Sequence, residues 1–259
     1  MTYALITGAS KGIGKAIATE LASRKINVLL IARDEQLLAA LAQTLQQQYQ
    51  IEAHYLALDL SLPGAVETIY NWVETNRFQV HILVNNAGYG LSGPFTDYSA
   101  EEHKAMMQVN MTVPVALTAT LLPMLKTNQP AYVLNIVSSA AYQSVPGLTT
   151  YAASKSFMLS FSRGLRYELR NTGISVTAVS PGSTDTGFAT RAKVGAKGLK
   201  AAEKVNMQPE AVAAIAVKAM FARKTEVITG FINQLGAFLV WLFPKRIAEK
   251  TAASIYELD

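Results

Sequence analysis

Short apolar segments alternate along the chain with segments in which apolar residues recur at helical spacing. The apolar segments are continuous rather than alternating in polarity, which is typical of strands buried on both faces of a parallel sheet. They cover residues 3–7, 26–32, 53–58, 81–85, 131–137 and 174–179, with a short edge strand at 225–230. The helical segments lie near 12–24, 35–49, 63–76, 100–126, 151–171 and 209–222. This alternation predicts an α/β fold with a doubly wound (Rossmann) parallel sheet in a three-layer α/β/α arrangement.

The length and the pattern together predict a single domain over residues 1–259. Such α/β domains often reach this length, and no repeat, low-complexity tract or Pro/Gly-rich linker marks a second domain. Residues 182–207 depart from the regular pattern, since they are polar, basic and glycine-containing and follow a predicted strand end. Because ligands bind beyond the carboxyl ends of parallel strands, we expect this segment to be a lid over a site. A solvated loop without function is the alternative.

An apolar C-terminal extension occupies residues 231–259. Its core, FINQLGAFLVWLFP at 231–244, is shorter than the roughly 20 apolar residues that span a bilayer. Since Lys245 and Arg246 follow, the segment could lie on a membrane surface as an amphipathic tail. It could also be a flap over the substrate mouth or a subunit contact that covers an apolar patch. We favour a contact or a flap.

Composition excludes several classes of function. Half of the residues are hydrophobic and 16% are charged, so the chain can bury a large core. The net charge of +5 is too modest for a nucleic-acid-binding protein. There is no cysteine, and His54, His81 and His103 lack the spacing of metal ligands, so we expect no metal site. The first residues lack the basic and apolar regions of a signal peptide, so we expect a cytoplasmic protein.

A glycine-rich turn follows the first predicted strand and opens the first helix. Gly8, Gly12 and Gly14 permit a tight turn and let backbone N–H groups approach a ligand without interference from Cβ atoms. The helix N-terminus adds a partial positive charge that suits a pyrophosphate. Glycines with a purely structural role in a turn are the alternative.

The spacing of these glycines resembles the TGxxxGxG turn of the short-chain dehydrogenase/reductase family, and further markers of that family follow in its order. They are NNAG at Asn85–Gly88, an asparagine at Asn110, a serine at Ser138, YxxxK at Tyr151–Lys155, and PG at Pro181–Gly182 with Thr184 and Thr186 beyond. Any one of them could arise by chance, but the ordered set is specific. The resemblance implies a cofactor site formed by Gly8, Ser10, Lys11, Gly12, Ile13, Gly14, Arg33, Asp59, Leu60, Asn86, Ala87, Gly88, Tyr151, Lys155, Pro181, Gly182, Thr184 and Thr186.

The end of the second strand indicates which cofactor binds. An acidic residue there would bind the adenosine ribose hydroxyls, whereas an arginine accommodates a 2′-phosphate. Arg33 occupies this place and Lys11 can add a second cation, so we expect NADP rather than NAD. Asp34 is the counter-argument, because a small backbone shift could aim it at the ribose. Asp59 resembles the adenine-binding aspartate of the family, although it could instead cap the following helix.

Tyr151 and Lys155 share one helix face because they are four residues apart. A free tyrosine has a pKa near 10, and a neighbouring ammonium group lowers it toward working pH. The resemblance implies that Tyr151 exchanges a proton with the carbonyl oxygen, while Ser138 hydrogen-bonds that oxygen. It further implies that Lys155 binds the nicotinamide ribose, Asn110 holds a water of a proton relay, and Thr186 holds the carboxamide. Ser139 is the alternative to Ser138, and a structural role is the alternative for Asn110.

The sequence identifies the reaction class better than the substrate. We expect an apolar pocket walled by Leu91, Phe95, Tyr142, Val145, Leu148 and Phe188. The chain resembles family branches that reduce ketosteroids, long-chain 3-oxoacyl thioesters and similar hydrophobic ketones. The resemblance also implies a homodimer or homotetramer built on the helices at 100–126 and 151–171. The alternatives are a non-catalytic NADP-binding regulator and a membrane-surface scaffold.

Overall fold

A computed structural model describes residues 1–203 and 206–256 of the chain. The residues 204–205 of the predicted lid and 257–259 of the C-terminal extension lie outside this range. One sheet of seven parallel strands has the order β3-β2-β1-β4-β5-β6-β7. The strands are β1 (Thr2–Thr7), β2 (Asn27–Ala32), β3 (Ala53–Ala57), β4 (Gln79–Asn85), β5 (Ala131–Ile136), β6 (Ile174–Ser180) and β7 (Glu226–Ile228).

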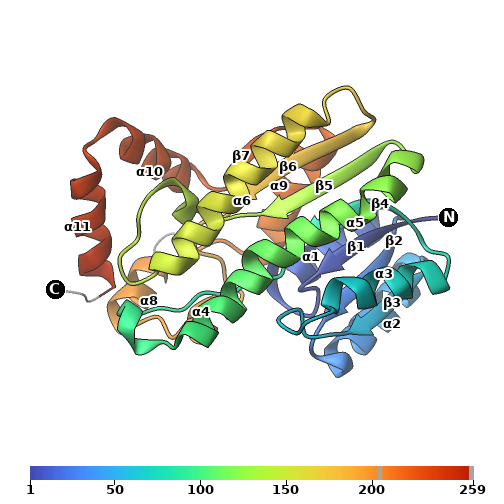
Figure 1. The fold of residues 1–259 in the computed structure, drawn as a ribbon, viewed down its shortest axis with the longest axis horizontal. Coiled ribbons are helices and arrows are strands. Elements are labelled where there is room, and N and C mark those ends of the chain that lie inside the picture. The colour runs from blue at the N-terminus through green and yellow to red at the C-terminus, as the bar shows by residue number, and fades with distance from the viewer. Residues whose placement is uncertain (204–205, 257–259) are drawn as a thin grey trace.

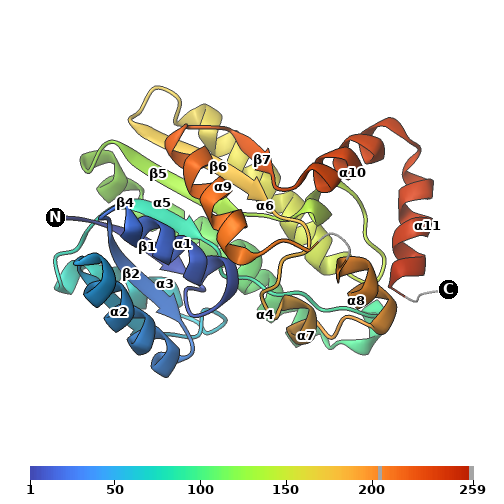
Figure 2. The same ribbon diagram turned by 180° about the vertical axis from the view of Figure 1, so that it is seen from behind.

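Helices cover both faces of the sheet, as Figures 1 and 2 show from opposite sides. One face carries α1 (Gly12–Ser23), α2 (Glu35–Tyr49) and α9 (Pro209–Phe221). The other carries α3 (Ala65–Thr75), α5 (Val113–Thr127) and α6 (Thr149–Glu168). The predicted doubly wound, three-layer fold of one domain is therefore confirmed.

The strands are continuously apolar because successive side chains enter different cores. On β1, Ala4 and Ile6 pack in the core beneath α1, α2 and α9. Between them, Leu5 packs in the core on the opposite face, with Leu29 and Leu83 of the two neighbouring strands. Since side chains alternate across a strand, a sheet covered on both sides needs apolar residues at every position. The strand order reverses at β1 and β4, which places a crevice beyond their carboxyl ends.

The helix predicted over 100–126 is interrupted in the structure. It consists of α4 (Ala100–Met107), a π-helical turn η2 (Gln108–Thr112) and α5. By length and hydropathy this run could cross a membrane. Its residues Leu117, Leu121 and Leu125 are fully buried against the sheet, so it is a core helix.

Two irregular regions gather beyond the carboxyl ends of the strands. The first, after β6, contains α7 (Phe188–Arg191) and α8 (Ala196–Glu203). Its base is closed where Asp185 N donates to Met207 O at 3.1 Å and Met207 N donates to Ser183 O at 3.0 Å. The second consists of α10 (Phe231–Leu242) and α11 (Lys245–Ile255), which form an arm at the end of the molecule opposite the N-terminus (Figures 1 and 2).

Candidate active site

In the turn between β1 and α1, backbone atoms of the turn lie very close to one another. Gly8 and Gly12 adopt φ values of +68° and +54°, which favour glycine. A Cβ atom at Gly14 would lie 2.3 Å from the carbonyl oxygen of Gly8. No other residue fits there without a backbone shift. The turn and the N-terminus of α1 therefore form a cradle that suits the pyrophosphate of a dinucleotide.

Hydrogen bonds fasten this turn to the NNAG segment after β4. The Thr7 hydroxyl accepts the backbone N–H groups of Asn86 and Ala87 at 3.0 and 3.1 Å. The Asn86 side chain donates to the carbonyl oxygens of Thr7 and Gly8 at 2.9 and 3.2 Å. Thr186 lies on the other side of the turn, where a Cβ atom at Gly12 would meet it at 2.7 Å. The predicted cofactor residues of the first, fourth and sixth strand ends are thus side by side.

The ends of β2 and β3 bring Arg33, Asp34 and Asp59 to one corner of the crevice. The Arg33 side chain is about half exposed (55%), and its Nη1 atom lies 3.9 Å from Asp59 Oδ2. Asp34 is engaged elsewhere, since it caps α2 by accepting the N–H of Leu37 at 3.1 Å. The Asp34 carboxylate thus caps α2, while the half-exposed guanidinium of Arg33 lies beside Asp59.

Asp59 does not cap the next helix, since Gly64 is the N-cap of α3. Its carboxylate accepts the N–H and the hydroxyl of Ser61 at 2.9 and 2.7 Å. The neighbouring Leu60 is buried in the core. Burial raises the pKa of Asp59, but the Ser61 hydrogen bonds and the charge of Arg33 lower it, and the net effect is a lowered pKa. The carboxylate is thus ionised beside the arginine.

Tyr151 and Lys155 lie on one face of α6, and both are buried. The Lys155 Nζ atom is 5.8 Å from the centre of the Tyr151 ring and donates to the carbonyl oxygen of Ile136 at 3.0 Å. A Cβ atom at Gly88 would lie 3.3 Å from the same Nζ. The lysine thus reaches the NNAG segment, on the wall of the glycine-lined crevice.

The π-helical turn η2 directs Asn110 toward this group. Its Oδ1 atom accepts the N–H of Tyr89 at 3.1 Å, and its Nδ2 atom donates to the carbonyl oxygen of Tyr89 at 3.0 Å. The Nδ2 atom also donates to the Ser154 hydroxyl of α6 at 3.1 Å. Turns of this kind are frequent at functional sites because they re-aim one side chain. Asn110 therefore joins the segment after β4 to the helix that carries Tyr151 and Lys155.

Ser138 lies at the end of β5, where its hydroxyl accepts the N–H of Ala140 at 3.1 Å. The same side chain lies close enough to Tyr151 to lower the pKa of the phenol. The backbone N–H of the alternative residue, Ser139, donates to the carbonyl oxygen of Pro181 at 2.7 Å and so joins this turn to the PG segment. Ser138 is thus the serine that faces the phenol.

Burial dominates the electrostatics of the pair. It raises the pKa of Tyr151 to about 12, against the opposing effect of the Ser138 side chain. It lowers the pKa of Lys155 to about 8. The sequence predicts that the lysine lowers the pKa of the tyrosine, but in this structure burial raises that pKa and Lys155 is not among the groups that shift it. The reason is that the phenol lies beneath apolar side chains and the ammonium group is bonded to Ile136.

An apolar cluster covers the phenol. The Phe188 ring of α7 lies 5.1 Å from the Tyr151 ring, and Tyr256, just after α11, packs in the same cluster. Four predicted pocket residues belong to it, namely Leu91, Val145, Leu148 and Phe188. The other two do not. Phe95 is exposed and stacks on His103, while the Tyr142 hydroxyl bonds Ser180 and Glu226 in a separate cluster.

Three contributors to this site are absent from the sequence-based prediction. Ser154 is one turn from Tyr151 on the same helix, so its position could have been inferred from spacing. Thr7 immediately precedes the first glycine. Tyr256 gives no local signal, because its contact with the cluster joins residues more than a hundred positions apart. Only a long-range contact of this kind requires the folded structure.

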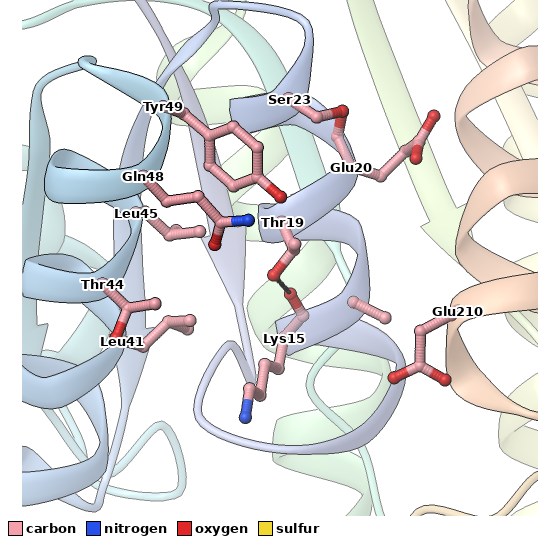
Figure 3. Close-up of a pocket in the computed structure, with 11 residues that line it drawn as sticks. Lys15, Thr19, Glu20, Ser23, Leu41, Thr44, Leu45, Gln48, Tyr49 and Glu210 are labelled. Atoms are coloured by element: carbon pink, nitrogen blue, oxygen red, sulfur yellow. Dashed lines mark hydrogen bonds between the residues drawn. The ribbon is translucent and has the colours of Figure 1, made fainter.

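Other polar features lie apart from this site. A surface groove of about 350 Å³ between α1 and α2 is lined by Lys15, Glu20 and Tyr49 among others (Figure 3). It lies on the outer helical layer and shares no residue with the cluster around Tyr151. Of the three histidines, His81 contacts the carbonyl oxygen of Tyr3, His103 contacts that of Phe95, and His54 lies 3.6 Å from the Glu52 carboxylate.

Comparison with known proteins identifies the family. The short chain dehydrogenase family profile matches residues 2–197. The chain is 34% identical to an uncharacterized oxidoreductase of Staphylococcus saprophyticus over 71% of this chain and 78% of that protein. It is 36% identical to a very-long-chain 3-oxoacyl-CoA reductase of Anas platyrhynchos over 69% of this chain and 58% of that protein. The chain belongs to the short-chain dehydrogenase family of oxidoreductases.

Solved structures agree with this assignment. A short-chain dehydrogenase of Sphingobium yanoikuyae in complex with NADPH has a TM-score of 0.82 and 30% identity, over 89% of each chain. A Burkholderia phymatum family member in complex with NAD has a TM-score of 0.82 and 25% identity, over 92% of each chain. A 7β-hydroxysteroid dehydrogenase has a TM-score of 0.83 and 25% identity, over 99% of this chain and 96% of that one.

Proposed function

We propose that this protein is an NADP-dependent reductase that reversibly converts a hydrophobic ketone to a secondary alcohol. One observation carries the proposal: Asn110, Ser138, Tyr151 and Lys155 converge at the edge of the glycine-lined crevice from separate elements of the fold. The crevice residues that fit the dinucleotide are the glycine turn, Asn86–Gly88, Pro181–Gly182, Thr184 and Thr186. When bound, NADPH supplies the hydride.

The remaining chemistry belongs to the chain itself. Tyr151 gives the proton of its Oη atom to the carbonyl oxygen and takes it back in the oxidative direction. Ser138 donates a hydrogen bond to the same oxygen and stabilises its developing charge. Lys155 orients the cofactor ribose and stabilises the phenolate. Asn110 holds the water of a proton relay that reaches Lys155. Residues 182–207 act as the lid, and Phe188 excludes water from the phenol.

The cofactor preference is argued from charge. Arg33 faces the crevice while Asp34 caps α2, so a 2′-phosphate meets a guanidinium rather than a carboxylate. Arg191 of the lid adds a further cation on this side, with its guanidinium 4.2 Å from the centre of the Tyr89 ring. Solved structures of relatives contain NADPH in one case and NAD in another, so the preference of this chain is argued from its own residues.

The substrate class is argued from the apolar cluster around Tyr151 and from relatives that act on long-chain 3-oxoacyl-CoA or hydroxysteroids. The test is a screen of NADPH oxidation over cyclic ketones, ketosteroids and 3-oxoacyl thioesters, with NADH in parallel and Tyr151→Phe as the blank. Turnover of an apolar ketone with NADPH supports the proposal. NADPH binding without turnover of any substrate would instead indicate a non-catalytic regulator. A homo-oligomer in the cytoplasm remains the prediction of the sequence.

A further inference from the structure

The outer face of α10 is apolar except for Gln234. Its exposed large side chains are Phe231, Ile232, Leu235, Phe238, Leu239, Trp241 and Leu242. Most recur at intervals of three or four residues and so form one stripe. The half-buried positions that face the protein are Asn233, Ala237 and Val240. A helix on the surface of a globular protein normally has the opposite arrangement, with its apolar stripe inward.

The stripe continues past the end of α10 through Phe243 and Ile247. We call the exposed apolar residues of 231–247 the C-terminal apolar surface. It holds half of the large apolar side chains that are exposed in the described part of the chain. Its side chains are exposed, and Figures 1 and 2 show that α10 and α11 form an arm at one end of the molecule. A continuous surface of this kind marks a site of interaction.

Cations border this surface. In residues 231–256 the charged side chains are Lys245, Arg246, Glu249 and Lys250, and the three cations are exposed while Glu249 is half-buried. Trp241 is the most exposed apolar side chain of the surface, at 79%. Tryptophan beside lysine and arginine at the end of an apolar helix is typical of a segment at a membrane interface.

The charge of the arm also distinguishes between two possible partners of this surface, a lipid bilayer and a second copy of the chain. Anionic lipids attract exposed lysine and arginine side chains. In an isologous contact the surface would meet its own copy. Within the described residues of the arm, that copy offers the half-buried Glu249 as its sole carboxylate to three exposed cations. Next to the apolar surface the exposed cations Lys245, Arg246 and Lys250 outnumber Glu249, and this local charge favours an anionic lipid surface.

The inner side of the arm reaches the candidate active site. Asn233 donates to the carbonyl oxygen of Thr229 at 2.8 Å and packs on the PG segment, where a Cβ atom at Gly182 would lie 2.2 Å from it. From α11, the buried Ala252 packs with Tyr256 in the cluster that covers Tyr151. The same two helices thus carry the apolar surface outside and the cover of the phenol inside.

We propose that the C-terminal apolar surface docks on an anionic lipid bilayer, with α10 lying in the interface and Lys245, Arg246 and Lys250 at the headgroups. Docking places the cover of Tyr151 beside the lipid, so an apolar carbonyl compound can enter the site from the bilayer. This second consequence rests on the proposed function, whereas docking itself does not.

Tryptophan fluorescence tests the docking. The chain has two tryptophans, so Trp72→Phe leaves Trp241 as the sole reporter. Vesicles of phosphatidylglycerol and phosphatidylcholine in equal parts should shift its emission to shorter wavelength, and pure phosphatidylcholine vesicles should do so much less. An emission wavelength that does not change when vesicles are added, or that shifts only with protein concentration, overturns the proposal.

Matched variants locate the contact by vesicle sedimentation. Leu242 and Leu62 are both 56% exposed, on α10 and on the loop before α3. Leu242→Ser should lower the vesicle affinity roughly tenfold, while Leu62→Ser leaves it unchanged. The double variant Lys245→Gln/Arg246→Gln should also weaken binding roughly tenfold, unlike Arg77→Gln/Lys126→Gln, which removes two exposed cations elsewhere.

Equal losses in a test variant and its control contradict the assignment of the surface. Loss of an oligomer in Leu242→Ser, without any change in vesicle sedimentation, would show that a second copy covers it. These measurements contain neither cofactor nor ketone. Failure of docking and failure of the proposed reductase activity are therefore observed separately.

Discussion

The ammonium group of Lys155 lies 5.8 Å from the centre of the Tyr151 ring, and both side chains are buried on one face of α6. Burial opposes the charged form of each, so the two pKa values move apart: that of the lysine falls to about 8 and that of the tyrosine rises to about 12. Uncovering the phenol reduces this desolvation. The lid residue Phe188 and the C-terminal residue Tyr256 therefore bear directly on the acidity of the proposed proton donor.

Replacing Tyr151 with phenylalanine should reduce kcat by roughly 100- to 10,000-fold, the range of general acid–base catalysis. NADPH affinity should change by no more than a few-fold, because the phenol exchanges a proton with the substrate. Rates of NADPH oxidation and a fluorescence titration of the cofactor measure the two effects. Tyr132→Phe is the control, since Tyr132 is buried on β5 beside Phe221. A Tyr151→Phe enzyme that keeps most of its activity would falsify the assignment.

Replacing Lys155 with methionine should stabilise the protein at pH 7 and inactivate it. The folded-state pKa of about 8 lies below the ordinary value of 10.5, because burial disfavours the charged lysine. Burying the charged form therefore destabilises the folded protein, and the whole of this cost is present below pH 8. The unfolded chain binds more protons between pH 8 and 10.5, so this cost disappears as the pH rises. Its full size is on the order of 3 kcal/mol.

Urea unfolding of wild type and Lys155→Met at pH 7 and pH 9.5 measures this effect. The gain in the free energy of unfolding should be larger at the lower pH. A gain that is constant or grows with pH contradicts the depressed pKa.

Replacing Gly14 with alanine should destabilise the protein by about 1 to 3 kcal/mol, as overpacking against backbone does. The new Cβ atom would lie 2.3 Å from the carbonyl oxygen of Gly8, so the turn must move. Dinucleotide binding should weaken roughly tenfold or more, because that turn is the proposed pyrophosphate cradle. Thermal unfolding and cofactor titration report the two losses.

Gly164→Ala is the matched control for Gly14→Ala. Gly164 lies exposed within α6, and a Cβ atom there meets open space. Alanine should stabilise this helix by about 0.5 to 1 kcal/mol without affecting cofactor binding. If both variants bind NADPH like the wild type, the turn does not hold the cofactor.

Replacing Arg33 with aspartate should weaken binding of NADPH roughly 10- to 100-fold, because a charge-assisted contact to the 2′-phosphate is lost. NADH, which lacks this phosphate, should be affected little or favoured. Asp34→Ala should leave the preference unchanged and cost about 1 kcal/mol of stability, since Asp34 caps α2. The ratio of kcat/KM for the two cofactors measures the preference. An unchanged ratio in Arg33→Asp, or a large change in Asp34→Ala, contradicts the assignment of the cofactor preference to Arg33.

The chain pattern was sufficient to predict the sheet and most of its helices. The inner strands β1, β2, β4, β5 and β6 are short runs that pack on both faces, so their apolar residues are contiguous in sequence. The glycine turn and the Tyr151–Lys155 pair are also local, because a turn and one turn of helix place residues close together in the chain. Such features depend on neighbours within a few positions, and sequence reasoning finds them.

The remaining features depend on contacts between distant segments. The π-helical turn at Asn110 is held by hydrogen bonds to Tyr89 and Ser154, so periodicity alone predicts an unbroken helix. Burial sets the pKa values of Tyr151 and Lys155, and that burial comes from side chains of other elements, among them Phe188 and Tyr256. The hydropathy of residues 231–244 marks an apolar helix, but its outward orientation follows from the packing of Asn233 on the PG segment. Desolvation and orientation are properties of surroundings, which the chain assembles only when it folds.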